Sequence, residues 1–265
     1  MTDLPAVPLA RVLQRVEAIW GPAHAPHHLL YGMSGSGKTT LIKALLGLCD
    51  SERVLVIDPK PAADPVWEGP DGDPHQWGKP VTAISPEFGY DGEKGGGPHR
   101  LWYRLTGGPD RADTARRFAV ALGIVAAEGH TVLVLDDVRE TCRQLGLALG
   151  VDSVMNLGRS ANVCAILSTT ETGYVSGRSQ GGMVWVGHTT GLNAAKAGAE
   201  LLGWRGRERQ DTCAAVAPHQ WIFSEDQPGS AGPCIVTGLI RRTGIAGGDG
   251  GTSIRQLAPA GIASA

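Results

Sequence analysis

An eight-residue motif near the start of the chain constrains the fold more than any other feature. Residues 32–39 read GMSGSGKT, which matches G-x-x-x-x-G-K-[S/T] at every fixed position and follows the apolar segment 27–31. Between a strand and a helix this pattern predicts a phosphate-binding loop. Its glycines let successive N–H groups point at a triphosphate, and the helix directs its positive dipole end at the same charge. The alternative, a Gly/Ser turn without a ligand, is disfavoured by the complete match.

The motif assigns a role to each of its residues. Lys38 is expected to reach the β- and γ-phosphates, and Thr39 is expected to place its hydroxyl on Mg²⁺. ATP and Mg²⁺ are therefore the predicted cofactors. The residues expected to bind the nucleotide are Gly32, Met33, Ser34, Gly35, Ser36, Gly37, Lys38, Thr39 and Thr40.

The composition fits one α/β domain in a reducing compartment. The chain of 265 residues is long enough to bury a substantial core. Its apolar runs are too short to span a bilayer, and its first residues lack the pattern of a secretory signal, so we expect no membrane insertion. The five cysteines are odd in number and widely spaced, which predicts buried thiols rather than disulfides or a zinc site. The net charge of −2 excludes a global basic field, so a DNA partner would need a local basic surface or a ring of subunits.

Apolar periodicity predicts strands and helices that alternate along the chain, which indicates an α/β fold with a mainly parallel sheet sandwiched by helices. Strands are expected at 27–31, 53–58, 81–84, 131–135, 163–168, 183–188, 221–225 and 234–240, and helices at 9–20, 38–48, 111–128, 138–159 and 192–202. The predicted organisation is an N-terminal amphipathic helix arm at 1–25, a P-loop ATPase domain at 26–240 with a loop-rich insertion at about 61–110, and a disordered tail at 241–265.

Two carboxylates follow the apolar strand at 131–135. Asp136 is expected to hold Mg²⁺, and Asp137 is expected to orient and deprotonate the attacking water. The alternative for the pair is an N-cap with an acidic first residue for the helix that follows. Asp137 is able to serve partly as that cap, whereas Asp136 is not expected to be only structural.

Four segments together resemble the FtsK/HerA superfamily of ATP-driven DNA pumps. They are GMSGSGKT, the strand that runs into IDPK, the acidic strand VLVLDD, and LGRSANVCAILSTT. The superfamily includes chromosome translocases, conjugative coupling proteins and viral packaging ATPases, and the similarity covers roughly residues 27–225. It implies a P-loop NTPase fold with a RecA-like (ASCE) mainly parallel sheet sandwiched by helices. The size of the chain is similar to that of the compact viral packaging ATPases.

The resemblance also implies residue roles. The tip of the strand in LGRSANVCAILSTT lies beside the γ-phosphate in the family, and Thr170 stands there where Gln is usual, so Thr170 is the candidate sensor. Asp137 stands where Glu is common. An arginine from the neighbouring subunit completes the site in the family, and Arg159 is the first candidate for it and Arg178 the second. The alternative for Arg159 is a solvated helix cap.

The implied assembly is a ring, usually a hexamer, with ATP at the subunit boundary. The implied partners are double-stranded DNA bound without sequence preference, further copies of the chain, and a docking protein at a capsid vertex or a membrane. The implied location is the cytoplasm of a host cell or a virion.

Other polar segments allow both a functional and a structural interpretation. The loop at 171–182 either touches DNA phosphates in a ring channel or is a plain surface loop. The basic cluster at 205–209 either binds phosphates or begins a solvated helix. Asp58 and Lys60 are expected beside the nucleotide crevice, where they would position the hydrolytic groups or the channel loops; the alternative for Lys60 is an exposed turn residue. For the tryptophans at 67, 77 and 102, packing is favoured over base stacking.

The predicted function is an ATP-hydrolysing motor that translocates double-stranded DNA, above all in viral genome packaging. A plasmid conjugative DNA-transfer ATPase is the alternative within the same class. A small-molecule phosphotransferase belongs to another class, and the Arg-poor segment 62–109 would serve poorly as its lid. A scaffold that binds ATP without hydrolysing it stays open because of Asp137, whereas the lack of an N-K-x-D segment disfavours a GTPase switch.

Overall fold

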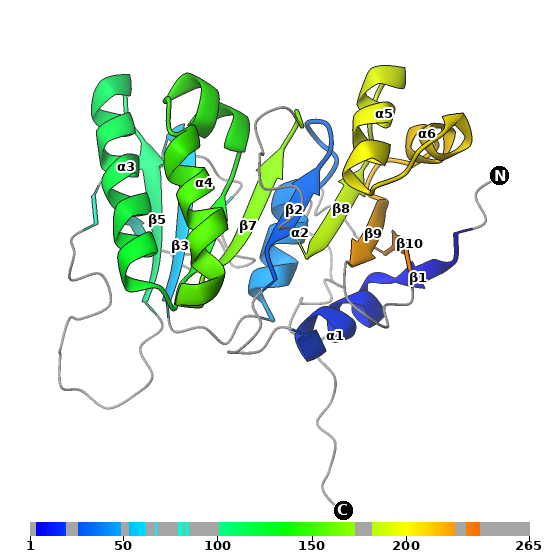
Figure 1. The fold of residues 1–265 in the computed structure, drawn as a ribbon, viewed down its shortest axis with the longest axis horizontal. Helices are drawn as coiled ribbons and strands as arrows, with labels where there is room; N and C mark the ends of the chain where they lie inside the picture. The colour runs from blue at the N-terminus through cyan, green and yellow to red at the C-terminus, as the bar shows by residue number, and fades with distance from the viewer. Residues whose placement is uncertain are drawn as a thin grey trace, which may run out of the picture.

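A ten-stranded sheet with helices on both faces forms the body of the molecule (Figure 1). The computed structural model describes residues 4–19, 26–48, 53–61, 67, 79–81, 83–84, 101–172, 182–225 and 232–238. The strands are β1 (Ala6–Pro8), β2 (His28–Tyr31), β3 (Arg53–Pro61), β4 (Lys79–Val81), β5 (Leu101–Gly107), β6 (Val132–Leu135), β7 (Cys164–Thr169), β8 (Met183–Gly187), β9 (Trp221–Glu225) and β10 (Cys234–Thr237). The α-helices are α1 (Leu9–Ile19), α2 (Lys38–Leu46), α3 (Arg111–Glu128), α4 (Ala148–Leu157), α5 (Leu192–Leu201) and α6 (Arg207–Ala214), with a π-helix η2 (Glu140–Gln144) and a 3₁₀-helix η3 (Gly158–Ala161).

The order of the strands brings the phosphate loop next to the acidic strand. The sheet runs β1-β10-β9-β8-β2-β7-β6-β3-β5-β4, so β7 lies between β2, which precedes the loop, and β6, which precedes the two aspartates. Strands β8, β2, β7, β6, β3, β5 and β4 are parallel, and only β9 runs antiparallel to its neighbours in the described sheet. The carboxyl ends of the parallel strands therefore share one edge, which is called the catalytic edge below.

Side chains of the central strands alternate between two hydrophobic cores, one on each face of the sheet. Leu55 and Ile57 of β3 lie in the core under α3, α4, α5 and α6, whereas Val54 and Val56 lie in the core under α1 and α2. The central strands are buried on both faces, as is usual for parallel strands covered by helices (Figure 1). The mainly parallel α/β architecture predicted from the sequence is confirmed.

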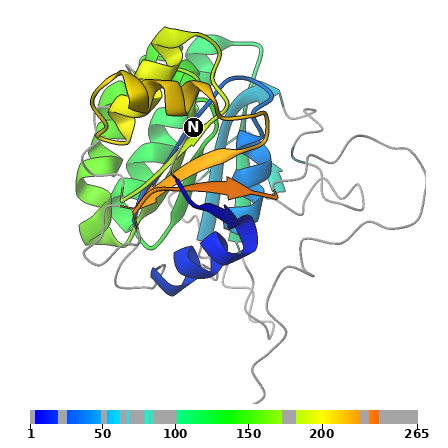
Figure 2. The same cartoon turned by 90° about the vertical axis from the view of Figure 1, so that its right-hand side faces the viewer.

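The N-terminal helix belongs to the edge of this sheet. Figure 2 shows α1 beside β1 and β10, and β1 pairs in parallel with β10. The helix buries Leu9, Val12, Leu13 and Val16 against the same core as α2, because these residues recur at helical spacing. An ion pair joins Arg15 to Glu225 at the end of β9.

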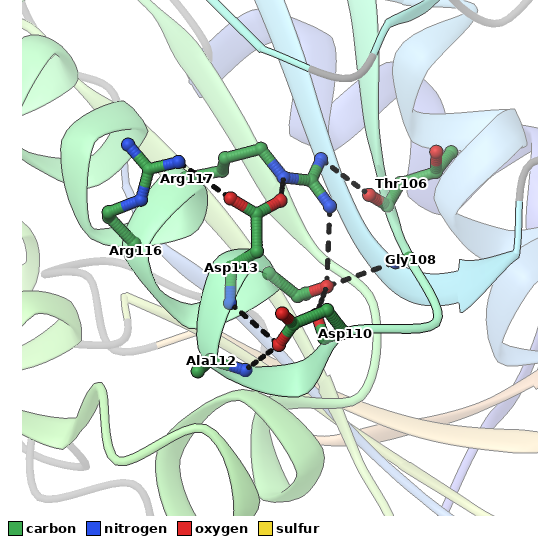
Figure 3. Close-up of polar contacts among 8 residues, drawn as sticks. Thr106, Gly108, Asp110, Ala112, Asp113, Arg116 and Arg117 are labelled. Atoms are coloured by element: carbon green, nitrogen blue, oxygen red, sulfur yellow. Dashed lines mark hydrogen bonds and ion pairs between the residues drawn. The ribbon is translucent and has the colours of Figure 1, made fainter.

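Helix α3 has the bounds expected from the sequence, and its first turn is held by polar contacts (Figure 3). The Asp110 carboxylate accepts hydrogen bonds from the N–H groups of Ala112 and Asp113, which makes Asp110 the N-cap. Arg117 donates to Asp113 at 2.8 Å and to the carbonyl of Thr106 at 3.3 Å, so α3 is bonded to the end of β5.

The single helix expected over 138–159 is wrong in its continuity. The chain forms η2, breaks at Gly146, whose φ is 73°, and then continues as α4 and η3. The break is held from outside, since the Arg111 side chain donates to both the carbonyl and the side-chain oxygen of Gln144 at 2.9 Å. This contact joins residues that are 33 positions apart, so it cannot be predicted from the periodicity of the segment.

Part of the stretch expected to be loop-rich belongs to the sheet. Strand β4 overlaps the short strand expected at 81–84, whereas β5 was not expected and pairs with β3 along its whole length. Trp67 is fully buried in the core under α2, in line with the packing interpretation, while Trp77 and the tail at 241–265 lie outside the described residues.

The cysteines that the structure describes are buried thiols, as predicted: Cys142, Cys164, Cys213 and Cys234. Burial raises the pKa of Cys213 to about 12. Within the part of the chain that the structure describes, no helix has both the length and the apolarity to cross a bilayer.

Candidate active site

The phosphate loop connects β2 to α2 at the catalytic edge. Gly35 and Gly37 have φ values of 79° and 95°, a region that favours glycine, and they allow the backbone to curl. A Cβ on Gly32 would lie 2.8 Å from the Oγ of Ser36, which is itself buried under the loop. The sequence motif is thus folded as a tight loop that leads directly into α2.

Neighbouring strands fix the first residues of the loop. Gly32 N donates to the carbonyl of Thr169 at 3.2 Å, and Met33 N donates to the carbonyl of His188 at 3.0 Å. The His188 ring nitrogen Nδ1 in turn lies 2.7 Å from the carbonyl of Val216, beyond the end of α6. The loop is therefore tied to β7 on one side and to the segment after β8 on the other.

Lys38 lies over this loop. Its Nζ donates to the carbonyls of Gly32 at 2.7 Å and Met33 at 3.0 Å. Burial lowers the pKa of Lys38, while the negative charges of Asp136 and Asp137 act in the opposite direction. The ammonium group is thus held at the place where a bound triphosphate would need a positive charge.

Asp136 follows β6 and is buried beside the tip of β7. Its Oδ1 accepts a hydrogen bond from the Ser168 hydroxyl at 2.7 Å. Its Oδ2 is buried, makes no hydrogen bond among the described residues, and lies 3.5 Å from the Nζ of Lys60. One carboxylate oxygen is therefore engaged by a hydroxyl and the other faces cationic groups.

The donor set at this place fits Mg²⁺. The buried Asp136 Oδ2 is a hard anionic ligand, and Thr39 in the first turn of α2 supplies a hydroxyl. Mg²⁺ is commonly bound through one or two protein groups plus substrate phosphates, so these two residues are the ones that would hold it.

Asp137 has a constrained backbone and a capping contact. Its φ is 62°, its N–H donates to the Ser168 hydroxyl at 3.1 Å, and its Oδ1 accepts from the N–H of Glu140 at 3.2 Å. The carboxylate therefore caps the first turn of η2, the role that the sequence analysis named as its alternative. A π-helix next to a strained residue is common at functional sites.

The structure places Thr170 at the catalytic edge and Arg159 at the opposite edge of the sheet. Thr170 directly follows β7 at the catalytic edge and is half-buried. Arg159 lies in η3, before β7 begins, and therefore at the opposite edge of the sheet. The side chain of Arg159 and the whole of Arg178 lie outside the described residues.

Two contacts of the site were not predicted from the sequence. Ser168, which lies within the segment LGRSANVCAILSTT, bonds both Asp136 and the backbone of Asp137. Arg104 of β5 is 2% exposed, and its Nη1 lies 3.9 Å from the Oδ2 of the fully buried Asp58. A charged residue inside the apolar run LWYRLTG was the available signal for this second contact.

The fold is similar to that of solved ATPases. The genome packaging NTPase B204 from Sulfolobus turreted icosahedral virus 2, in complex with AMPPCP, matches with a TM-score of 0.59 and 16% identity over 83% of this chain and 100% of that chain. The cytoplasmic domain of the Thermomonospora curvata type VII secretion ATPase EccC matches with a TM-score of 0.51 and 16% identity over 79% of this chain and 25% of that one. EssC (ATPases 2 and 3) from Geobacillus thermodenitrificans matches with a TM-score of 0.50 and 10% identity over 80% and 39%.

Comparisons of the sequence with protein-family models and with curated proteins found no match. Identities of this size show the fold alone. The structural resemblance predicted from the sequence is confirmed at that level: the chain has the fold of FtsK/HerA-type ATPases.

Proposed function

We propose that this chain is an ATP-hydrolysing motor that translocates double-stranded DNA, with viral genome packaging as its setting. The observation that carries the proposal is the grouping of Lys38, Asp136 and Ser168 at one edge of a sheet in which β7 separates β2 from β6. The match to a viral packaging NTPase over the full length of that protein supports the setting. Transfer of plasmid DNA between cells is the same activity in another setting.

Different residues of the chain bind the phosphates and the metal ion during phosphoryl transfer. Lys38 binds the β- and γ-phosphates, and the backbone N–H groups of the loop bind the remaining phosphate oxygens. Thr39 and Asp136 hold Mg²⁺, which neutralises the charge on the phosphate oxygens when it is bound. The Ser168 hydroxyl donates to the Oδ1 of Asp136, which leaves the Oδ2 of Asp136 for the metal.

The attacking water needs a base at this edge. Asp137 takes that role in the proposal, since it follows Asp136 directly and its position is fixed by the hydroxyl of Ser168. Its carboxylate must then leave the N–H of Glu140 or act through its other oxygen. Arg159 of a neighbouring subunit, supplied across a ring interface, stabilises the charge of the transition state.

The capping contact of Asp137 favours one competing function. A carboxylate that only caps η2 would leave a site that binds ATP without hydrolysing it, and the chain would then be a nucleotide-gated scaffold. Binding and turnover separate the two functions.

The test is steady-state ATP hydrolysis with and without long double-stranded DNA at low salt, with Lys38→Ala as the blank. We expect duplex DNA to stimulate hydrolysis and the stimulation to fade as salt rises, because contacts to phosphates release counterions. A hydrolysis rate that does not change with any nucleic acid would overturn the proposed DNA-translocating function. Tight ATP binding without turnover would favour the nucleotide-gated scaffold.

A further inference from the structure

A second ammonium group lies at the carboxylate assigned to Mg²⁺. The Nζ of Lys60 is 3.5 Å from the Oδ2 of Asp136, and the two side chains are 43% and 5% exposed. Lys60 is also close enough to Lys38 to contribute to the lowering of the Lys38 pKa, after burial as the main cause. Lys60 therefore belongs to the phosphate site rather than to a separate surface turn.

The carboxyl-terminal end of β3, which carries Lys60, is held by buried contacts. Lys60 N donates to the Oδ1 of Asp58 at 3.0 Å, and Asp58 is fully buried beside Arg104. On the other side, a Cβ on Gly107 would lie only 1.9 Å from the carbonyl oxygen of Pro59. Buried contacts on β3 and β5 thus direct this end of β3 towards the catalytic edge, although Lys60 itself is half-exposed.

The two oxygens of Asp136 have different partners. Ser168 occupies Oδ1, so Oδ2 is the oxygen that approaches Lys60 and also the oxygen left for a metal ion. An ammonium group and Mg²⁺ cannot both contact one carboxylate oxygen closely without strong repulsion. A metal ion that binds there must displace the ammonium group.

We propose that Lys60 is a positioning residue that competes with Mg²⁺ for Asp136 and thereby sets how strongly ATP binding depends on the metal. This inference rests on the proposed nucleotide site. With Lys60 present, ATP without Mg²⁺ gains a cation near its phosphates, and Mg²⁺ must displace an ammonium group. Both effects reduce the coupling between the metal and the nucleotide.

Loss of the Lys60 charge should make ATP binding depend more strongly on Mg²⁺. Removal of the charge in Lys60→Met weakens the binding of metal-free ATP and leaves the binding of Mg·ATP unchanged or tighter. The ratio of the dissociation constants without and with Mg²⁺ should therefore rise by roughly tenfold, the lower end of the range for one charge a few ångströms away, because water screens the half-exposed ammonium group. By linkage, the nucleotide must increase Mg²⁺ affinity by the same additional factor.

The experiment is a fluorescence titration with a slowly hydrolysed, mant-labelled ATP analogue, in EDTA and in saturating Mg²⁺. Lys60→Met is compared with wild type, with Lys60→Arg, which keeps the charge, and with Lys196→Met, which removes an exposed lysine on α5. We expect the larger ratio in Lys60→Met alone. Thermal unfolding of each variant verifies that the fold is kept.

An unchanged ratio in folded Lys60→Met overturns the inference, and so does the same increase in Lys196→Met. These outcomes differ from a failure of the proposed function. If wild type binds no ATP in either condition, the nucleotide site itself is wrong, whereas normal wild-type binding with an unchanged ratio removes only the role of Lys60.

Discussion

Two neighbouring histidines at the start of the central strand are enclosed by the two cores. His27 Nδ1 accepts a hydrogen bond from Ala165 N at 3.0 Å, and its Nε2 lies 3.2 Å from the carbonyl of Met155, so its proton is assigned to Nε2. His28 Nδ1 accepts from the indole N–H of Trp185 at 3.3 Å. Burial, followed by the neighbouring His27, lowers the pKa of His28 from 6.5 to about 3.

This burial predicts a loss of stability in mild acid. As the pH falls, the unfolded chain binds a proton at His28 at a higher pH than the folded chain does. The contribution of neutral His28 to the free energy of unfolding is therefore fully present above pH 6.5 and decreases as the pH falls towards 3. The loss from His28 between its ordinary pKa and about pH 5 is roughly 2 kcal/mol. His28→Gln keeps an acceptor for Trp185 and removes the titration, so its free energy of unfolding should depend less on pH.

Urea unfolding at several pH values between about 7 and 5 measures this dependence. The control is His130→Asn, which removes an exposed histidine and keeps a residue that tolerates the left-handed backbone found there, with φ of 46°. A pH profile of His28→Gln as steep as that of wild type would contradict the prediction.

At the same residue scale, the sequence predicted the groups of the site better than their contacts. Lys38 and Asp136 were identified because their motifs are continuous in sequence. The bond from Ser168 to Asp136 depends on the pairing of β6 with β7, and the approach of Lys60 to Asp136 depends on the pairing of β3 with β6. Such contacts arise from strand order, which local patterns do not contain.

At the scale of elements, the expected pattern held where one segment decides its own structure. Helix α3 and strand β9 have the bounds predicted from periodicity alone. The helix expected over 138–159 is broken at Gly146, whose φ is 73°, and Arg111 of α3 bonds Gln144 just before the break. Strand β5 was hidden among glycines and a charged residue, and its place in the sheet is set by pairing with β3.

The contact between the ends of β3 and β5 gives a test at this scale. Gly107→Ala would place a Cβ against the backbone of Pro59, so we expect a loss of about 1–3 kcal/mol in the free energy of unfolding. Gly123→Ala is the matched control, since its Cβ would meet no atom within 4 Å and it lies within α3. There alanine should stabilise by about 0.5–1 kcal/mol.

Urea midpoints of the two variants measured side by side check this prediction. Opposite shifts are the expected result. A Gly107→Ala protein as stable as wild type would show that the end of β3 that carries Pro59 and Lys60 is free to move away from β5.

At the scale of the whole molecule, the two edges of the sheet have different contents. The phosphate loop, Asp136 and Ser168 lie at the catalytic edge, whereas Arg159 precedes β7 at the other edge. Strand β7 has six residues and spans roughly 20 Å. This separation is too long for Arg159 to reach the phosphate loop of its own chain, so any role in hydrolysis requires a second copy.

A mixing experiment tests this division of labour. Arg159→Ala should keep nucleotide binding and lose about three to five orders of magnitude in DNA-stimulated hydrolysis, the usual contribution of a trans arginine. Lys38→Ala should fail at nucleotide binding but still present Arg159 to a neighbour. In a mixture of the two variants, the intact phosphate loop of one chain meets the intact arginine of the other, and hydrolysis should rise above that of either variant alone. Mixed rings with no recovered activity, formed from subunits shown to associate, would place Arg159 outside the catalytic machinery and return it to the role of a solvated helix cap.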